Sequence, residues 1–165
     1  MKALYIVRHA KSNNDDPRLA DIDRPLNSRG LRDAPEMGRR LLKRGVIVDT
    51  IISSPALRAQ TTAKLIAESM NEDVSKVSAD DRIYASDISG MMVLIRSLSD
   101  SLDRVMFVGH DPTFSDLVDE LSGGSIDSVP TCAIYGVELP IDSWSKTRFE
   151  DAKELFYDYP KKSFE

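Results

Sequence analysis

Short apolar runs alternate with amphipathic helical patterns along this chain, and this alternation restricts its fold more than any other feature. Residues 4–7, 50–52 and 104–109 are rich in strand-forming side chains and lack polar alternation, which is typical of central strands buried on both faces. Apolar residues recur at helical spacing between these runs. We therefore expect an α/β fold, a three-layer sandwich in which helices cover both faces of a mostly parallel sheet.

Four helical stripes occupy the intervals between and after the strands. The first is expected to end at Gly45, and Pro35 should delay its start or kink it. The apolar residues of the stripes are Leu31, Ala34, Met37, Leu41 and Leu42 in the first, Ala59, Ala63, Ile66, Ala67 and Met70 in the second, residues 88–98 in the third, and Phe114, Leu117, Val118 and Leu121 in the fourth.

A capping residue followed by proline marks two of the helix starts, at Ser54-Pro55 and at Asp111-Pro112. Weaker patterns predict further strands, which would include an antiparallel edge, at residues 77–83, 132–139 and 154–159. No repeat or linker divides the chain, so residues 1–165 are expected to form a single domain.

The composition restricts the partners of the chain. It has 22 basic and 27 acidic residues, a formal net charge of -5, which argues against a general nucleic-acid surface. No apolar run approaches the roughly 18 residues that a membrane span needs, and the short apolar start ends at Arg8, unlike a signal peptide. Cys132 is the only cysteine, so no internal disulfide can form and a cytoplasmic location is expected. The oligomeric state stays open.

The chain has two histidines, His9 and His110, and each follows a predicted buried strand. Ligands bind at this carboxyl edge in open α/β sheets. Arg8 ends the first strand, and Arg58 falls in the first turn of the helix after the second. Taken singly, each of these residues is more often a packing or solvated side chain than a catalyst. Burying the Arg8 guanidinium is costly without an anion, however, and the joint placement on one edge favours a functional site.

Two arginines and two imidazoles in a dry pocket suit a compact dianion such as a phosphoryl group, because the guanidinium fork matches phosphate oxygens. Phosphoryl transfer needs positioning, charge stabilisation and a nucleophile, and a neutral imidazole can be that nucleophile. Cys132 is a poor rival, because it falls in a predicted strand as a small buried hydrophobe. The sequence has no Walker-type phosphate loop and no zinc-ligand spacing.

Three segments, in the same order, resemble the motifs of the histidine phosphatase superfamily, which has a phosphoglycerate-mutase-like fold. Residues 7–12 are similar to its Arg-His-Gly signature, residues 53–63 to its second motif and residues 108–112 to its third. Similarity to the SixA-type phosphohistidine phosphatases in particular is carried by Asp23-Arg24-Pro25-Leu26 with Gly30, by Pro130-Thr131 and by Tyr159-Pro160-Lys161.

The resemblance implies a role for each matching residue. His9 would be the nucleophile that becomes phosphorylated, while Arg8, Arg58 and His110 would hold the nonbridging oxygens as charge builds in the transition state. Ser12 would donate a further hydrogen bond to the substrate. No metal or organic cofactor is implied.

Two departures from the family pattern bear on the mechanism. Ala10 replaces the usual glycine, which is tolerable where that position does not need positive φ. Many relatives have a glutamate as proton donor, but residues 82–87 contain none. Asp87 could substitute, although it is better interpreted as a helix cap. The general acid stays open, and further candidates lie in the first loop, namely Asp15, Asp16, Asp21 and Asp23.

Without a general acid, a phosphoramidate is an easier substrate than a phosphate ester, because imidazole needs less protonation to leave than an alkoxide does. We therefore expect a metal-independent phosphatase that acts on protein phosphohistidine through His9. One alternative is a phosphatase of small phosphate esters. A non-catalytic phosphate-binding module is less favoured, because the four core residues are all present.

Overall fold

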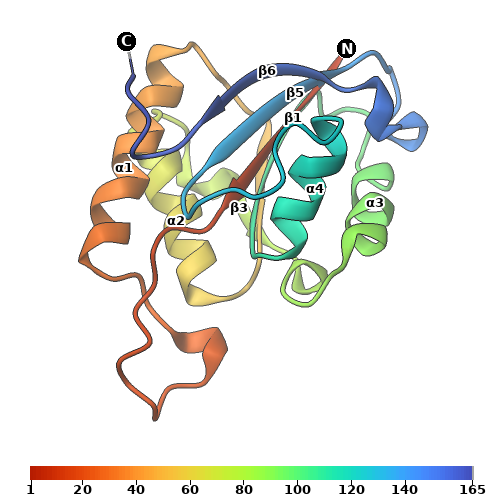
Figure 1. Ribbon diagram of the computed structural model, residues 1–165. Coiled ribbons are helices and arrows are strands. Elements are labelled where there is room, and N and C mark those ends of the chain that lie inside the picture. The colour runs from red at the N-terminus through yellow and green to blue at the C-terminus, as the bar shows by residue number, and fades with distance from the viewer. Residues whose placement is uncertain (165) are drawn as a thin grey trace.

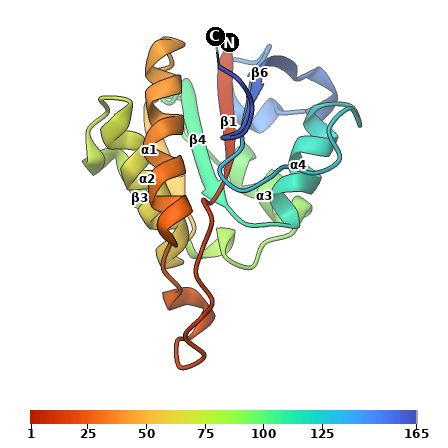
Figure 2. The same cartoon turned by 60° about the vertical axis from the view of Figure 1, so that its left-hand side comes forward.

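The computed structural model describes residues 1–164, which form one six-stranded sheet with helices on both faces (Figures 1 and 2). The strand order is β3-β2-β4-β1-β5-β6. Strands β3, β2, β4 and β1 are parallel to one another, whereas β5 is antiparallel to β1 and β6 is antiparallel to β5. The predicted fold class is confirmed. The strands are β1 Lys2–Arg8, β2 Thr50–Ser53, β3 Val77–Ala79, β4 Arg104–Gly109, β5 Ile134–Leu139 and β6 Lys153–Asp158.

Helices form the two outer layers of the sandwich. Figure 2 shows α1 and α2 together on one face of the sheet and α3 and α4 on the other. The helices are α1 Ser28–Lys43, α2 Leu57–Ser69, α3 Ile88–Arg96 and α4 Thr113–Leu121. None of the helices in residues 1–164 combines the length and the apolar character that crossing a membrane requires.

Each face of the sheet has its own hydrophobic core, because successive side chains of a strand point to opposite faces. In β1, Leu4 and Ile6 pack with residues of α3 and α4, whereas Tyr5 and Val7 pack with residues of α1 and α2. Trp144 is fully buried in the first of these cores, and its indole N–H donates to the carbonyl of Leu102 at 2.7 Å. The continuous apolar runs in the sequence therefore have partners on both sides.

Helix α1 departs from the prediction in two respects. Leu31 and Leu42 are exposed (52% and 44%), because only a narrow stripe of α1 contacts α2 and the sheet, and the expected contribution of these two leucines to the core is wrong. Pro35 does not delay the helix, which begins at Ser28 with the side chain of Asn27 accepting a hydrogen bond from Gly30 N–H. The predicted end is correct, since Gly45 follows the helix with φ 75°.

Both predicted cap-plus-proline starts are displaced. Helix α2 begins at Leu57, and the Ser54 hydroxyl accepts instead from Ala56 N–H at 3.1 Å, inside the turn that precedes the helix. Helix α4 begins one residue after Pro112, although the Asp111 carboxylate does accept from Ser115 N–H at 3.1 Å. In both places the tight turn at the end of a strand takes up the residues that the sequence pattern assigns to the helix.

The weaker strand predictions are partly wrong as well. The expected strand at residues 77–83 is shorter, because a 3-10 turn at Asp81–Ile83 follows β3. Cys132 is buried as predicted but lies before β5, in a turn where its φ is 63°. The antiparallel edge strand begins and ends one residue earlier than residues 154–159.

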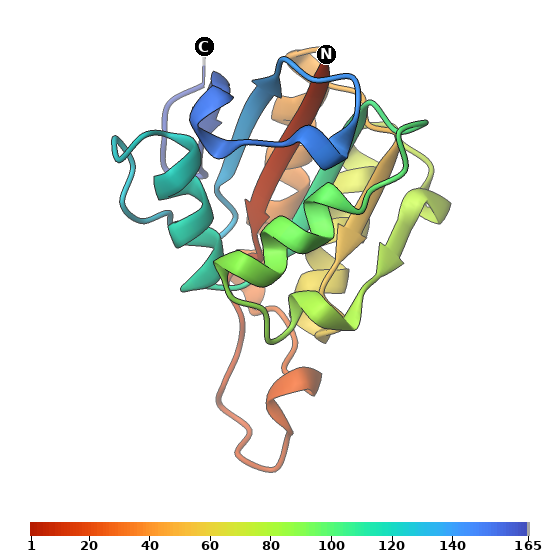
Figure 3. The same ribbon diagram turned by 90° about the vertical axis from the view of Figure 1, so that its right-hand side faces the viewer.

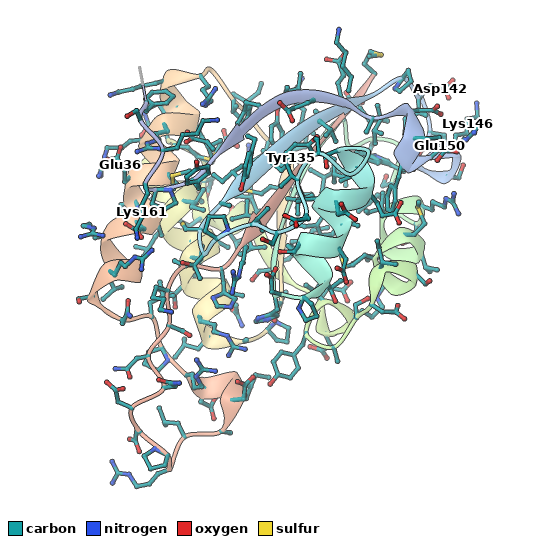
Figure 4. The ribbon with its side chains drawn as sticks, in the orientation of Figure 1. Glu36, Tyr135, Asp142, Lys146, Glu150 and Lys161 are labelled. Carbon is teal, nitrogen blue, oxygen red and sulfur yellow. The ribbon has the colours of Figure 1, made fainter. Side chains whose placement is uncertain are left out.

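A buried ion cluster ties the end of β6 to α1. Asp158 is only 1% exposed, and its carboxylate accepts from Arg40 Nη1 at 2.9 Å and from Arg44 Nη2 at 3.3 Å. Arg40 also donates to the carbonyls of Tyr159 and Pro160, so the chain after β6 is held along α1. Lys161 of this segment lies close to Glu36 of α1 (Figure 4).

Candidate active site

The parallel pairing of β1 with β4 brings the two histidines together. Arg8 at the end of β1 is opposite Gly109 at the end of β4, and His9 N–H donates to the Gly109 carbonyl at 2.9 Å. The imidazole rings of His9 and His110 are therefore neighbours, with centroids 5.1 Å apart. The predicted convergence of these strand ends is confirmed.

His9 is oriented by its own backbone. Its Nδ1 lies 2.7 Å from the carbonyl oxygen of Ala10, and because a carbonyl only accepts, Nδ1 carries the proton and Nε2 keeps its lone pair. Burial and the nearby arginine side chains lower the pKa of His9 from 6.5 to about 4, so the ring is neutral at pH 7. A neutral imidazole with a free nitrogen is what a histidine nucleophile requires.

Ala10 fits this position without backbone strain. Within residues 1–164, Asn71 and Cys132 are the non-glycine residues with positive φ, and Ala10 is not among them. The backbone at position 10 therefore does not require glycine. Its side chain is fully buried and its N–H donates to Thr62 Oγ1 of α2 at 3.0 Å. The departure from the Arg-His-Gly pattern is therefore tolerated here.

His110 is held by a residue that follows a different strand. Its Nε2 lies 2.7 Å from Ser54 Oγ, and its Nδ1 is buried with no hydrogen-bond partner among the described residues. Burial, followed by the neighbouring charges of His9 and Arg58, lowers the pKa of His110 to about 3. Nδ1 is therefore the atom of His110 that remains for a ligand.

The two predicted arginines approach the same place from different sides. Arg8 donates through Nη1 to the Val129 carbonyl at 2.9 Å and lies 3.5 Å from an Asp111 carboxylate oxygen, while its Nε is buried without a partner in the described chain. Arg58, 7% exposed, extends from the first turn of α2. An anion between these groups would satisfy both orphaned nitrogens, Arg8 Nε and His110 Nδ1.

These side chains line one pocket of about 310 Å³. Ser12 also lines it, and its hydroxyl accepts from Arg24 Nη2 at 2.8 Å, so the structure places all five predicted site residues together. The sequence prediction gave no role in the site to the remaining lining residues, Lys11, Asn14, Arg24, Asp111 and Thr131. Asp111 directly follows a strand-end histidine, and Arg24 falls in a segment of family resemblance, so a signal existed for both.

The segment between β1 and α1 forms the outer wall of this pocket. It extends beyond the sheet at the end opposite to the two termini (Figures 1 and 3). Its two arms are joined by backbone hydrogen bonds, among them Asn27 N–H to the Lys11 carbonyl at 3.0 Å. A Cβ at Gly30 would collide with that same carbonyl, so glycine permits this close approach.

Of the carboxylates considered as general acids, Asp87 and Asp21 are engaged in other contacts, and Asp15, Asp16 and Asp23 do not line the pocket. Asp87 accepts from Gly90 N–H at 2.8 Å and caps α3, as the sequence suggested. Asp21 accepts hydrogen bonds from three side chains, and the Tyr84 hydroxyl, with Arg58 and Arg24, holds the pKa of Asp21 well below its usual range. Asp111 is the one carboxylate among the lining residues, and it accepts from Ser115 Oγ at 2.7 Å. No described carboxyl group is free beside the pocket.

The thiol of Cys132 and the possible metal ligands were considered as well. Burial raises the pKa of the Cys132 thiol far above its ordinary value, and Cys132 does not line the pocket. Across residues 1–164, no three histidine, cysteine or acidic side chains lie close enough to hold a metal ion.

Comparison with known families agrees with this geometry. The family model of the histidine phosphatase superfamily (branch 1) matches residues 4–91. The chain belongs to this superfamily. Membership supports phosphatase activity, and the matched region contains Arg8, His9, Ser12 and Arg58.

Proteins similar to this chain include several of the SixA type. Phosphohistidine phosphatase SixA of Escherichia coli K12 is 25% identical over 138 residues, which cover 82% of this chain and 84% of that protein. The structure of a SixA-type protein from Agrobacterium tumefaciens has a TM-score of 0.81 at 22% identity, covering 96% of this chain and 98% of the other. A structure of the protein histidine phosphatase SixA complexed with tungstate has a TM-score of 0.80 at 23% identity, covering 96% and 97%. The two structural likenesses show the fold.

The protonation of the two imidazoles gives this histidine phosphatase a measurable signature. Because burial and positive neighbours disfavour the imidazolium forms, protonation needs a lower pH than the ordinary 6.5, with midpoints near 4 for His9 and near 3 for His110. The two are the only histidines in the chain, so an NMR titration of the imidazole C–H signals can follow both. A midpoint near 6.5 for His9 would contradict a buried ring beside arginines.

Proposed function

We propose that this chain is a phosphohistidine phosphatase, which hydrolyses a phosphoryl group through a covalent intermediate on His9. The observation that carries the proposal is a single pocket lined by His9, whose Nε2 keeps its lone pair, and by Arg8 and His110, whose Nε and Nδ1 are buried without a partner among residues 1–164. A nucleophile and unpaired donors around one small pocket suit a tetrahedral oxyanion. The substrate is the phosphoryl group on a histidine of another protein.

The first step transfers the phosphoryl group to His9. The Nε2 lone pair attacks phosphorus, a new N–P bond forms, and the P–N bond of the substrate breaks in line with it. The leaving imidazole keeps the electron pair of that bond. If its other ring nitrogen is protonated beforehand, it departs as a neutral molecule and needs no proton from the enzyme. His9 retains its Nδ1 proton and its hydrogen bond to Ala10.

The second step returns His9 to its starting state. Water attacks the phosphorus, the N–P bond to His9 breaks, and the electron pair returns to Nε2. The protons of the water stay with the released inorganic phosphate and the solvent. In both steps Arg8, Arg58 and His110 stabilise the charge on the nonbridging oxygens, while Ser12 contributes to the wall of the pocket next to Arg24.

The substrate class follows from the lack of a free acid. General acid–base catalysis contributes about 10²–10⁴-fold to a rate, and an alkoxide leaving group depends on it far more than an imidazole does. The carboxylate of Asp111 already accepts from Ser115 Oγ at 2.7 Å and lies 3.5 Å from Arg8 Nη1, so its contacts are within the protein. The name of the Escherichia coli relative, phosphohistidine phosphatase, supports the same substrate.

The comparisons also support the ligand chemistry. Tungstate is a tetrahedral oxyanion, and a SixA structure of the same fold is described as complexed with it. A cytoplasmic location stays a prediction from the single cysteine.

The proposal predicts a substrate preference. We expect kcat/KM for a phosphohistidine peptide to exceed that for simple sugar phosphates by at least roughly 100-fold. Ester hydrolysis would be slower by this factor because it lacks general acid catalysis. Release of inorganic phosphate measures both substrates, and a His9→Asn variant corrects for spontaneous hydrolysis of phosphohistidine. A clear preference for the sugar phosphates would identify a small-molecule phosphatase instead. Binding of phosphate without turnover of either substrate would identify a phosphate-binding module.

A further inference from the structure

One residue of the protruding segment connects three parts of the chain. The 3-10 turn Asp21–Asp23 lies on the returning arm of that segment and packs against α2 (Figure 3). The Asp21 carboxylate accepts from Arg58 Nη2 at 3.0 Å, from Arg24 Nη1 at 2.9 Å and from the Tyr84 hydroxyl at 2.6 Å. The backbone carbonyl of Asp21 accepts from Arg58 Nη1 at 2.7 Å.

The bonds to Arg58 fix the direction of its guanidinium group. Both terminal nitrogens of Arg58 donate to Asp21, one to its backbone and one to its side chain, which is a two-point contact. The planar group cannot rotate without breaking one of these bonds. Arg24 is held on the same carboxylate and also donates to Ser12, so it too has a fixed place at the pocket.

Tyr84 links this network to the opposite wall. Its ring meets the ring of His110 edge-on, with centroids 5.6 Å apart, while its hydroxyl reaches Asp21. Asp21 and Tyr84 therefore join the protruding segment to the segment after β3 through one hydrogen bond. Neither residue lines the pocket, so both act on a ligand only through Arg58, Arg24 and His110.

Two opposite effects on an anion could result from Asp21. Its negative charge repels an anion, whereas its hydrogen bonds orient the arginines that bind one. The carboxylate is 50% exposed, so water and salt screen its charge over the distance to the pocket. The hydrogen bonds to Arg58 act at direct contact and are not lost in this way. Orientation should therefore outweigh repulsion.

We propose that Asp21 is a positioning residue that aligns Arg58 and Arg24 for a tetrahedral oxyanion bound beside His9, with Tyr84 holding Asp21 in place. The inference rests on the proposed phosphoryl pocket and assigns the Asp21 carboxylate a task other than proton donation. The positioning role accounts for the presence of the acidic Asp21 side chain near a site for a dianion.

Tungstate affinity tests the proposal without any assumption about the substrate. We expect Asp21→Asn and Asp21→Ala to weaken the Kd for tungstate by about tenfold, the size of one lost charge-assisted hydrogen bond. Tyr84→Phe should weaken it in the same direction but less. Asp16→Asn is the matched control, because Asp16 lies in the same segment and its carboxylate pairs with Arg18 at the surface, away from the pocket lining, so the Kd of this variant should not change. Isothermal titration calorimetry at one ionic strength measures all of them.

Turnover supplies a readout that a purely structural role would not move. At a saturating concentration of phosphohistidine peptide, kcat of Asp21→Asn should fall, because Arg58 would no longer be oriented to stabilise the negative charge of the transition state. The melting temperature of this variant should stay near that of the wild type. Tighter tungstate binding by Asp21→Asn would show that Asp21 is a competing countercharge and would overturn the inference, and so would an unchanged Kd. A wild-type protein that binds no tungstate would overturn the proposed function, and this inference with it.

Discussion

Replacing His9 by asparagine should lower the turnover of a phosphohistidine peptide by at least roughly 10⁴-fold, because loss of a covalent nucleophile removes the reaction path itself. Asparagine can still donate to the Ala10 carbonyl that orients the His9 ring, but its amide nitrogen has no available lone pair. The site would therefore keep much of its shape and lose its nucleophile. Steady-state release of inorganic phosphate measures the effect.

His110→Asn is the matched control for this experiment. The same substitution at the other histidine removes a group that holds the oxyanion, which should cost only about 10²–10³-fold and leave the nucleophile in place. Both variants should melt near the wild-type temperature. If His9→Asn retained turnover within tenfold of the wild type, or fell no further than His110→Asn, His9 would not be the nucleophile.

Replacing Asp158 by alanine should lower the free energy of unfolding by about 3 kcal/mol, the low end of the range for breaking a buried ion pair, because Arg40 loses its buried carboxylate and keeps only the more exposed Glu36 at 3.3 Å. Arg40 and Asp158 are 8% and 1% exposed, so little water is present to replace the lost partner. Arg44 and the backbone N–H of Tyr159 lose an acceptor in the same variant. Urea denaturation followed by circular dichroism measures the change.

An exposed ion pair provides the comparison. Asp142 and Lys146 pair at 3.0 Å on the surface of the segment between β5 and β6 (Figure 4), where their side chains are 84% and 64% exposed. Asp142→Ala should leave the stability nearly unchanged, because solvent screens such pairs. If the two variants lost equal stability, burial of the Arg40–Asp158 pair would not be what makes it important.

Much of the fold and the core of the site could be predicted because they depend on local patterns. Buried parallel strands produce continuous apolar runs, and the residue after each run lies at the ligand-binding edge. His9 and His110 follow two such strands and lie together at that edge. The exposed Leu31 and Leu42 show the limit of such patterns, because helical spacing does not reveal how wide a stripe of α1 the neighbouring elements cover.

The contacts that complete the site connect residues far apart in the sequence. Ser54 contacts His110 only because β2 and β4 are neighbours in the sheet. In the sequence, the dipeptide Ser54-Pro55 predicted a helix cap instead. Asp21 could be counted among several loop aspartates, but its bonds to Arg58 and Tyr84 depend on how the long segment folds back. Sequence spacing contains no information about either contact.

Trapping the intermediate tests the central claim most directly. The protein would be mixed with a peptide carrying ³²P-labelled phosphohistidine, quenched within the first turnover in alkali, digested and sequenced by mass spectrometry. We predict label on His9 that survives alkali, is released by acid, and is absent from the His9→Asn variant. Turnover that leaves no label on the protein, or label on any residue other than His9, would contradict the account.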